Sequence, residues 1–521
     1  MAVDTRRRLH STTRDTRMSV DEQAAAKRAK LAARFGGDEP AGEAGAVSFG
    51  FGAPQGGADA RAAFGTNSKI INSSTTVAPV VARKPVVAAK SYVCEASEAL
   101  NFYMCDVKAV ESFAKGARGV EEDGFEPEFT HQVFREDESI FGYAGLSMSM
   151  YVCKRSLKAL LKIDYEDKIE SAMNPADPVR EQLGEWYEEH MYADEGRFKA
   201  EADMSTPCAG GTLISESEKD GVVTKLTAYE LWTNAEARAW HDAMEALAVF
   251  YIEAFSKIVD DDPRWTLLVA TRHHADGSWE TAGYTTVYRY YAYPDSERAR
   301  LSQIVVLPPY QRQGLGAQLL EAVRKLAIDR SMRDLTIEDP TDQLQRLRDV
   351  LDVKACLTTP DLWTKVQQAA VKAAHATTED ERRNALMCTA EIYTIAASKL
   401  KICKKQMRRV WEALLFIFAK RSNAPENSPV ADAFKELIIR RLKAMYVSNS
   451  DKDAGTKRIY AIGANDFVMT KARGKGGEAP QMEDPEEGQP DVTEVLGELF
   501  GECVGNLAFL HAQCKNILAA A

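Results

Sequence analysis

One segment, residues 301–328, constrains the fold more than any other part of this 521-residue chain. Its apolar run Ile304–Leu307 is rich in β-branched residues and stops at two prolines, which is typical of a buried strand. The loop Gln311–Gly316 follows, and the residues after it place apolar side chains at helical spacing. A strand, a glycine-bearing loop and a helix start in this order predict an anion site at the helix N-terminus.

The two glycines of this loop, Gly314 and Gly316, let the backbone approach a phosphate closely, and a side chain there would hold the ligand off. The G-x-G-x-x-G pattern and the Gly-Lys-Ser/Thr of a P-loop are both absent from the loop. Its order Gln-x-x-Gly-x-Gly instead resembles the pyrophosphate loop of GNAT N-acetyltransferases; a plain strand-to-helix turn is the alternative. The resemblance implies acetyl-coenzyme A as donor, with the pyrophosphate on Gln311, Arg312, Gln313, Gly314, Leu315, Gly316 and Ala317.

Bulk composition narrows the class of protein. The length allows two to four domains, and 45% apolar residues support real cores. A formal net charge of −11 argues against direct DNA binding and favours a basic partner, for which a Lys-rich polypeptide qualifies. Nine cysteines without a CxxC pair indicate a reducing compartment and argue against structural zinc, so no metal is expected. No apolar run reaches transmembrane length, and the N-terminus does not read as a secretory signal.

The pattern of apolar residues predicts an α+β fold in four regions. Residues 1–88, poor in large apolar residues, are expected to form a disordered tail, whose basic run Lys27–Arg34 fits either a nuclear-import patch or a solvated tail. The other regions are an N-terminal mixed α/β domain at 89–234, a catalytic GNAT domain at 235–352 and a helical region at 353–521, with a charged linker near 470–490. Strands are expected at 147–153, 222–231, 266–271, 282–290 and 335–337, and helices at 235–258, 363–375, 379–398, 401–420 and 492–518.

Acetyl transfer to an amine needs a group that removes a proton, because a lysine ammonium with a pKa of about 10.4 cannot attack. Glu338 and Asp339 directly follow the strand 335–337, which is expected beside Ile304–Leu307, so Glu338 would lie near the thioester. Carboxylates beside apolar strands would be partly desolvated, which favours a general base; a surface acidic turn is the alternative. Glu253 interrupts an apolar helical stretch, where a buried carboxylate needs a partner or a function, although partial exposure is possible.

Further blocks make the resemblance specific. They lie at 130–146, 258–265, 287–295, 305–323 and 337–340, and in order and spacing they resemble the type B histone acetyltransferase catalytic subunit. The helix at 401–415 resembles that family's C-terminal helix, so the resemblance runs from about Tyr92 to about Phe418. The chain before Tyr92 and after about Arg421 has no clear counterpart in the family's common core.

The resemblance implies acetylation of lysines of free histones, chiefly in the amino-terminal tail of histone four, by a protein of nucleus and cytoplasm that works with a WD-repeat histone chaperone. It implies Glu338 as general base, with Glu253 and Asp339 as acidic helpers. The backbone of Ile304, Val305 and Val306 would bind the pantetheine arm. The implied histone contacts are Trp265, Tyr288, Arg289 and Tyr290 in a groove and the acidic run Glu136, Asp137 and Glu138.

These residue types also fit a basic peptide on physical grounds. Carboxylates pair with Lys and Arg, and aromatic rings offer flat walls for an extended chain and its aliphatic stems. Alternate strand positions point to opposite faces, so about half of the tyrosines near Tyr290 are expected in the core. Arg289 departs from the pattern, because a cation in this cluster opposes a basic tail. Two alternatives are an N-acetyltransferase for small amines or other proteins, and a non-enzymatic histone escort.

Overall fold

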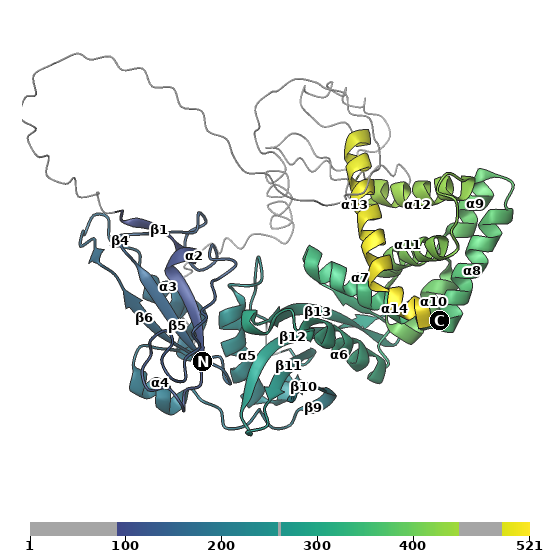
Figure 1. Cartoon of the computed structure of the whole chain (residues 1–521). Helices are drawn as coiled ribbons and strands as arrows, with labels where there is room; N and C mark the ends of the chain where they lie inside the picture. The colour runs from purple at the N-terminus through teal and green to yellow at the C-terminus, as the bar shows by residue number, and fades with distance from the viewer. Residues whose placement is uncertain (1–90, 259–261, 447–491, 521) are drawn as a thin grey trace, which may run out of the picture. The chain divides into compact units, whose positions relative to one another are not determined.

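The computed structural model of the protein describes residues 91–258, 262–446 and 492–520 (Figure 1). The expected tail 1–88, with its basic run, and the charged linker near 470–490 lie outside the described residues. Within the described ranges, mixed strands and helices are followed by helices alone, which confirms the predicted α+β fold class. No helix in these ranges is long and apolar enough to cross a membrane.

The N-terminal part is built around a four-stranded sheet of order β2-β5-β6-β8. Alternate residues of its strands face two cores: Phe102 and Met150 lie in one cluster, and Tyr151 and Leu160 lie in another. Strand β5 has the bounds expected from the sequence. The elements are β1 (Val93–Glu95), α2 (Ala96–Ala99), β2 (Leu100–Cys105), β3 (Ser139–Phe141), β4 (Tyr143–Ala144), β5 (Ser147–Cys153), β6 (Ala159–Asp164), β7 (Asp167–Lys168), α3 (Val179–Tyr187), η1 (Glu188–His190), β8 (Met191–Tyr192) and α4 (Glu195–Glu201).

The central part holds a six-stranded sheet of order β14-β13-β12-β11-β10-β9, in which only β13 and β14 are parallel. Its elements are β9 (Thr212–Lys219), β10 (Val222–Glu230), η2 (Leu231–Thr233), α5 (Ala235–Ala248), β11 (Trp265–His273), β12 (Trp279–Ala292), β13 (Ser296–Val306), η3 (Pro308–Tyr310), α6 (Leu315–Asp329) and β14 (Leu335–Ile337). Because β9 and β10 belong to the same sheet as β11, the domain boundary predicted at residue 234 cuts across this sheet.

Two helices cover the two faces of the central sheet. On β11, Leu267 packs in the cluster that contains α5, and the next residue, Leu268, packs in the cluster that contains α6. Strands covered on both faces read as continuous apolar runs, which explains the sequence Leu267–Ala270. This two-sided burial fixes the orientation of β13, whose end and following loop carry the candidate site.

The C-terminal part is helical and has its own apolar core around Trp411, Leu362 and Leu507. Its helices are α7 (Asp342–Leu357), α8 (Pro360–His375), α9 (Glu379–Leu386), α10 (Ala390–Leu400), α11 (Lys404–Arg421), α12 (Pro429–Tyr446), α13 (Val492–Gln513) and α14 (Lys515–Ala520). The single helix expected at 379–398 is wrong, because the structure divides it into α9 and α10. The Trp411 indole N–H donates to the Leu386 carbonyl at 2.8 Å, which satisfies the end of α9 from outside the helix. The predicted boundary at residue 352 falls inside α7.

Candidate active site

Strands β13 and β14 pair over three residues and then separate. The parallel pairing ends at Leu301 and Ile337, where the Glu338 N–H donates to the Leu301 carbonyl at 2.9 Å. Beyond this point β13 continues, and within the described residues no strand pairs with its outer edge. An unpaired strand edge can bind an extended ligand as an additional strand. The expected pantetheine-binding residues lie along this edge: Ile304, Val305 and Val306.

The expected pyrophosphate loop, Gln311–Ala317, follows η3 and includes the first three residues of α6. Its two glutamine side chains brace the backbone, because Gln311 Nε2 donates to the Val306 carbonyl at 3.0 Å and Gln313 Nε2 donates to the Pro309 carbonyl at 3.1 Å. Gly314 is the N-cap of α6, with φ +90°, and makes no side-chain cap. The first N–H groups of a helix need acceptors from outside the helix, so this start can receive an anion.

Glycine is favoured at Gly314 and at Gly316 for different physical reasons. At Gly314 the positive φ favours glycine, and an added Cβ would meet no atom within 4 Å, so a side chain would project into open space. At Gly316 an added Cβ would lie 3.3 Å from Leu347 Cδ2. The sequence argument that a side chain at either position would hold off a ligand therefore needs a correction, because at Gly316 the crowding comes from α7.

The Gly314→Val variant should bind acetyl-coenzyme A about 5- to 30-fold more weakly, which corresponds to the roughly 1–2 kcal/mol cost of placing a side chain in the left-handed region. Isothermal titration calorimetry with the full chain measures this. Gly221→Val is a matched control, because Gly221 also has a positive φ and open space around its Cβ but lies in the β9–β10 turn. Equal affinity losses in both variants would contradict the loop assignment.

Glu338 leaves β14 at the point where the strands separate. Ser302 Oγ donates to Glu338 Oε2 at 3.0 Å, and Arg300 Nη1 lies 3.9 Å from Glu338 Oε1. The Glu338 side chain is 48% exposed, and Asp339 is also exposed, with φ +31°. The desolvation expected for this pair is therefore not present in the structure. What the geometry does provide is an accessible, hydrogen-bonded carboxylate beside the open edge of β13.

Glu253 does not lie in a helix. Helix α5 ends at Ala248, ten residues earlier than the sequence predicted, and Glu253 is exposed in the following turn. The chain leaves the helix because the Phe250 carbonyl accepts hydrogen bonds from the N–H groups of Glu128 and Phe129, at 2.9 and 3.0 Å. The expectation of a buried carboxylate at Glu253 was therefore wrong.

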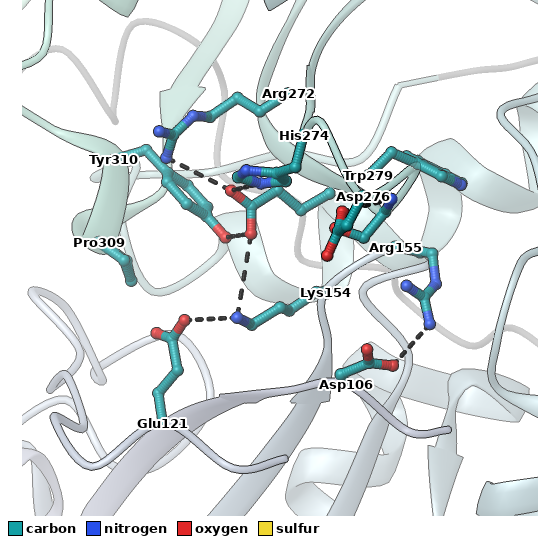
Figure 2. Close-up of a pocket in the computed structure, with 12 residues that line it drawn as sticks. Asp106, Glu121, Lys154, Arg155, Arg272, His274, Asp276, Trp279, Pro309 and Tyr310 are labelled. Carbon is teal, nitrogen blue, oxygen red and sulfur yellow. Dashed lines mark hydrogen bonds and ion pairs between the residues drawn. The ribbon is translucent and has the colours of Figure 1, made fainter. Parts of the chain in front are cut away.

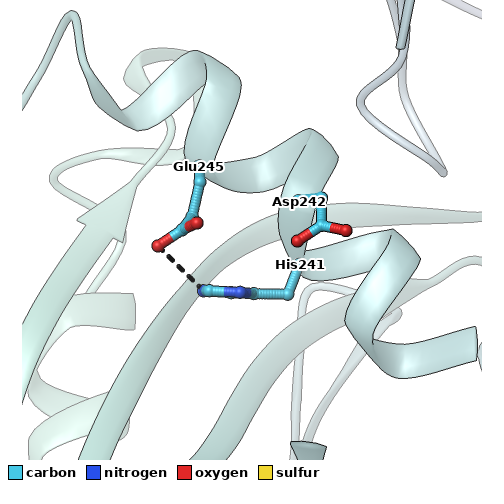
Figure 3. Close-up of side chains that lie close together, drawn as sticks. All are labelled: His241, Asp242 and Glu245. Carbon is cyan, nitrogen blue, oxygen red and sulfur yellow. Dashed lines mark ion pairs between the residues drawn. The ribbon is translucent and has the colours of Figure 1, made fainter. Parts of the chain in front are cut away.

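The buried carboxylate of this region is Glu245, which the sequence analysis missed. Glu245 Oε1 accepts from Gln303 Nε2 at 2.7 Å and from the Ile258 N–H at 2.9 Å, and His241 Nε2 lies 3.8 Å away (Figure 3). Gln303 Nε2 also donates to the Ser256 carbonyl at 3.0 Å. This group thus fixes the segment after α5 against β13. A His and a Glu four residues apart on an apolar helix face were the available signal.

The same side chains resemble a metal site only superficially. His241, Asp242 and Glu245 have ligand atoms within 4.8 Å of one another. However, the Glu245 oxygen nearest to His241 already accepts two N–H hydrogen bonds. A carboxylate oxygen engaged by two donors is a poor cation ligand, so we assign this group a structural role.

Three aromatic rings form a ladder on one face of the sheet. Trp265 lies opposite Tyr288 in the β11–β12 register, with ring centroids 4.8 Å apart, and Tyr290 follows at 4.6 Å from Tyr288. Cross-strand and i, i+2 neighbours share a face, which explains the stacking. The Asp262 carboxylate accepts from the Tyr288 hydroxyl at 2.8 Å, and the Arg264 hydrogen bonds hold the pKa of Asp262 well below its usual range.

Arg289 does not belong to this ladder. As the residue between Tyr288 and Tyr290 it points to the opposite face, where it donates to the Pro263 carbonyl at 2.5 Å and lies 3.8 Å from Glu230. The structure thus leaves Arg289 outside the expected histone groove. It also removes the conflict between this cation and a basic substrate.

The acidic run 136–138 belongs to a turn of the N-terminal part. Glu138 Oε2 accepts from Thr130 Oγ1 at 2.7 Å, and Asp137 Oδ1 accepts from the Ser139 N–H and hydroxyl, at 3.2 and 2.8 Å. Glu136 is exposed. In the part of the chain that the structure describes, no hydrogen bond or ion pair joins this run to the aromatic ladder. Two of the three carboxylates therefore stabilise a local turn.

A charged cavity of about 460 Å³ lies beside η3, lined by residues of the β11–β12 hairpin and of the segments that follow β2 and β5 in the N-terminal part (Figure 2). Glu280 lies at this cavity: it accepts a hydrogen bond from the Tyr310 hydroxyl at 2.9 Å, and its other oxygen lies 3.3 Å from Arg272 Nη1 and 3.1 Å from His274 Nε2. Lys154 lies 4.0 Å from the same carboxylate. These interactions fix the position of Tyr310, the last residue before the loop. The charged residues of the cavity therefore help to position the loop that forms the expected anion site.

Comparisons with known proteins agree with this geometry. Residues 92–253 match the family model described as histone acetyl transferase HAT1 N-terminus, and residues 226–347 match the acetyltransferase (GNAT) family. The second match contains the loop, the ladder and Glu338. Together the two matches span the part of the chain from β1 to β14.

Individual proteins similar to this chain are type B histone acetyltransferase catalytic subunits, and the similarity covers most of their length. The chain is 32% identical over 315 residues to the histone acetyltransferase type B catalytic subunit of Mus musculus, covering 58% of this chain and 71% of that protein. It is 33% identical over 338 residues to the subunit of the same name from Rattus norvegicus, covering 62% and 75%. The subunit of that name from Zea mays is 28% identical over 341 residues, covering 62% and 69%.

Proposed function

The chain belongs to the family of type B histone acetyltransferase catalytic subunits, and from this premise we propose that it transfers acetyl from acetyl-coenzyme A to lysine ε-amines of free histones. Its enzyme class is histone acetyltransferase. The observation that supports the reaction best is the position of Glu338, an accessible carboxylate where β13 and β14 separate, next to an open strand edge.

Acetyl-coenzyme A is the donor substrate in this proposal. The edge of Ile304–Val306 binds its pantetheine arm through backbone groups, and the loop Gln311–Ala317 with the α6 N-terminus binds the pyrophosphate. These residues fit the group, because among the described strands none pairs with this edge and the helix start has no side-chain cap. The thioester supplies an activated acyl group, and this chain's residues hold it in place.

The chemical step needs a neutral amine. Glu338 takes a proton from the lysine ammonium, directly or through a water, and the amine nitrogen then attacks the thioester carbonyl carbon. A C–N bond forms, the C–S bond breaks, and the coenzyme A thiolate that leaves takes up the second proton, which the nitrogen releases as it becomes an amide. Asp339 and Glu253 contribute negative charge that attracts the cationic substrate, as acidic helpers of Glu338.

The proposed acceptor is the amino-terminal tail of histone four. The ladder of Trp265, Tyr288 and Tyr290 gives aromatic walls that fit the aliphatic stems of lysine side chains. A WD-repeat histone chaperone as partner and a location in nucleus and cytoplasm complete the proposal.

An acetylation assay with purified free histones tests the proposal. The full chain and acetyl-coenzyme A are incubated with each histone or with polyamines, and the products are located by mass spectrometry. We expect the highest kcat/KM on lysines of the histone four tail. Preference for polyamines would support a small-amine acetyltransferase, and histone binding without acetyl transfer would support an escort.

A further inference from the structure

Three arginines lie at the aromatic ladder, and two of them are held by their own carboxylate. Arg298 donates to both oxygens of Asp334, at 2.5 and 2.8 Å, and Arg264 donates to both oxygens of Asp262, at 2.9 and 2.6 Å. Bidentate pairs of this kind neutralise the cation and fix its geometry. These two arginines therefore present little free charge to a substrate.

Arg300 is held differently. Its guanidinium lies over the Tyr290 ring, 4.4 Å from the centroid, and Nη1 donates to the Tyr290 hydroxyl at 3.3 Å. Within the described residues its ion pair is the 3.9 Å approach to Glu338, which is too long for a hydrogen bond. An aromatic face holds a cation without neutralising it. The positive charge of Arg300 thus remains beside the proposed general base.

The position of Arg300 follows from the sheet. In the register of the sheet, Arg300 lies opposite Tyr288 on β12 and beside Thr336 on β14. It is two residues before Ser302, so both side chains point to the same face of the sheet. Ser302 and Arg300 therefore approach the two oxygens of Glu338 from the same strand, at 3.0 and 3.9 Å. The carboxylate is oriented by β13, the strand whose edge is proposed to bind the donor.

From this arrangement we infer that Arg300 is a positioning residue with two effects on acetyl transfer. It orients the Glu338 carboxylate, and its positive charge, which is only loosely paired with Glu338, disfavours the ammonium form of a lysine that arrives at that carboxylate. The inference rests on the proposed function, because it assumes a lysine acceptor and Glu338 as base. A neighbouring cation activates amine nucleophiles in this way by making the charged form less stable.

Other charged and titratable groups lie in the same region. Asp262 and Arg264 come from the segment before β11, and Arg298 and Asp334 pair with each other. Glu338 and Asp339 come from the turn after β14, and Tyr288 and Tyr290 come from β12. Among these, Arg300 and Glu338 are the pair whose separation leaves both charges open to an incoming amine.

The test compares Arg300→Gln with Arg300→Lys in the full chain. Initial rates with a histone four tail peptide and saturating acetyl-coenzyme A are measured from pH 6.5 to pH 10. We expect Arg300→Gln to lower kcat about tenfold at pH 7, which corresponds to about one pKa unit of the bound amine, and to approach wild type near pH 10. The peptide KM should stay equal or fall, because a like charge has been removed. Arg300→Lys should keep most of the wild-type profile.

A matched control separates charge from packing. Arg264→Gln removes an arginine that also lies over a ladder ring, 4.8 Å from the Tyr288 centroid, but is paired with Asp262. Its effect on rate should be the same at every pH. A peptide with S-aminoethylcysteine at the acceptor position, whose amine is less basic than that of lysine, should show a smaller loss in Arg300→Gln.

Two results would overturn the inference. One is a loss in Arg300→Gln that is constant from pH 6.5 to pH 10, and the other is an Arg300→Lys variant as impaired as Arg300→Gln. Failure of the proposed function would give a different result. The wild-type protein would then not acetylate the peptide, or the Glu338→Gln variant would acetylate it at the wild-type rate.

Discussion

Replacing Glu338 by glutamine should lower kcat on the histone four tail by about 10²–10⁴-fold at neutral pH, the usual loss for a missing general base. Glutamine keeps the shape of the side chain and can still bond to Ser302, but it cannot take a proton from the lysine ammonium. The KM values for peptide and acetyl-coenzyme A should change little, because the strand edge and the loop are untouched. Steady-state kinetics with the full chain measure the three quantities.

A surface carboxylate provides the matched control for this variant. Glu321 is exposed on α6, outside the candidate site, so Glu321→Gln makes the same chemical change with no expected effect on kcat. If Glu338→Gln and wild type transferred acetyl equally slowly while both bound histone, Glu338 would not be the base and the escort alternative would gain. A loss caused by misfolding would appear as a lower melting temperature in Glu338→Gln but not in Glu321→Gln.

Local patterns in the sequence predicted the parts of the site that depend on neighbours in the chain. The strand, loop and helix around Gly314 follow from β-branched residues, two prolines and helical apolar spacing within about thirty residues. The short strand before Glu338 could be predicted for the same reason. The ladder of Trp265 and Tyr288 also depends on the register between β11 and β12, and it was the family resemblance that assigned these residues to one groove.

Errors arose where distant parts of the chain satisfy backbone groups. Helix α5 ends early because Phe250 bonds to Glu128 and Phe129, more than one hundred residues away in sequence. Its apolar pattern continues past that point, so the pattern alone extends the helix and misplaces Glu253. The buried role of Glu245 depends on Gln303, a partner on β13 that no local pattern indicates.

The region after Arg421, which has no clear counterpart in the family's common core, is packed on the helical part by a buried ion pair. Arg441 of α12 donates to both oxygens of Glu412 on α11, at 2.7 and 2.9 Å. Both side chains are largely buried, and Arg441 also bonds to Cys503 on α13 at 3.3 Å. Desolvation by burial raises the pKa of Glu412, while Arg441 opposes that shift. This pair joins three helices, so it tests whether α12 and α13 are integral to the fold.

The Arg441→Met variant should lose about 3–5 kcal/mol of unfolding free energy at pH 7–8, because it leaves the Glu412 carboxylate buried without its partner. Urea denaturation followed by tryptophan fluorescence, to which Trp411 in this core contributes, measures the loss. Without Arg441, the pKa of Glu412 in the folded variant should rise further above the ordinary glutamate value of about 4.3. A raised folded-state pKa means that the protonated carboxyl group contributes stability. This contribution is fully present below the ordinary pKa and is lost as pH rises through the folded-state pKa. The deficit relative to wild type should therefore shrink toward pH 5.

The double variant Glu412→Met/Arg441→Met supplies the control for that result. Removing both charges leaves neither one buried alone, and apolar side chains of similar size fill the space, so most of the loss should be recovered. A double variant as unstable as Arg441→Met, or a deficit that is equal at pH 5 and pH 8, would show that the stability does not come from the charge pair. If the double variant regains stability and the deficit of Arg441→Met shrinks toward pH 5, α12 is held on α11 through Glu412. The helices beyond Arg421 then fold as part of the same core.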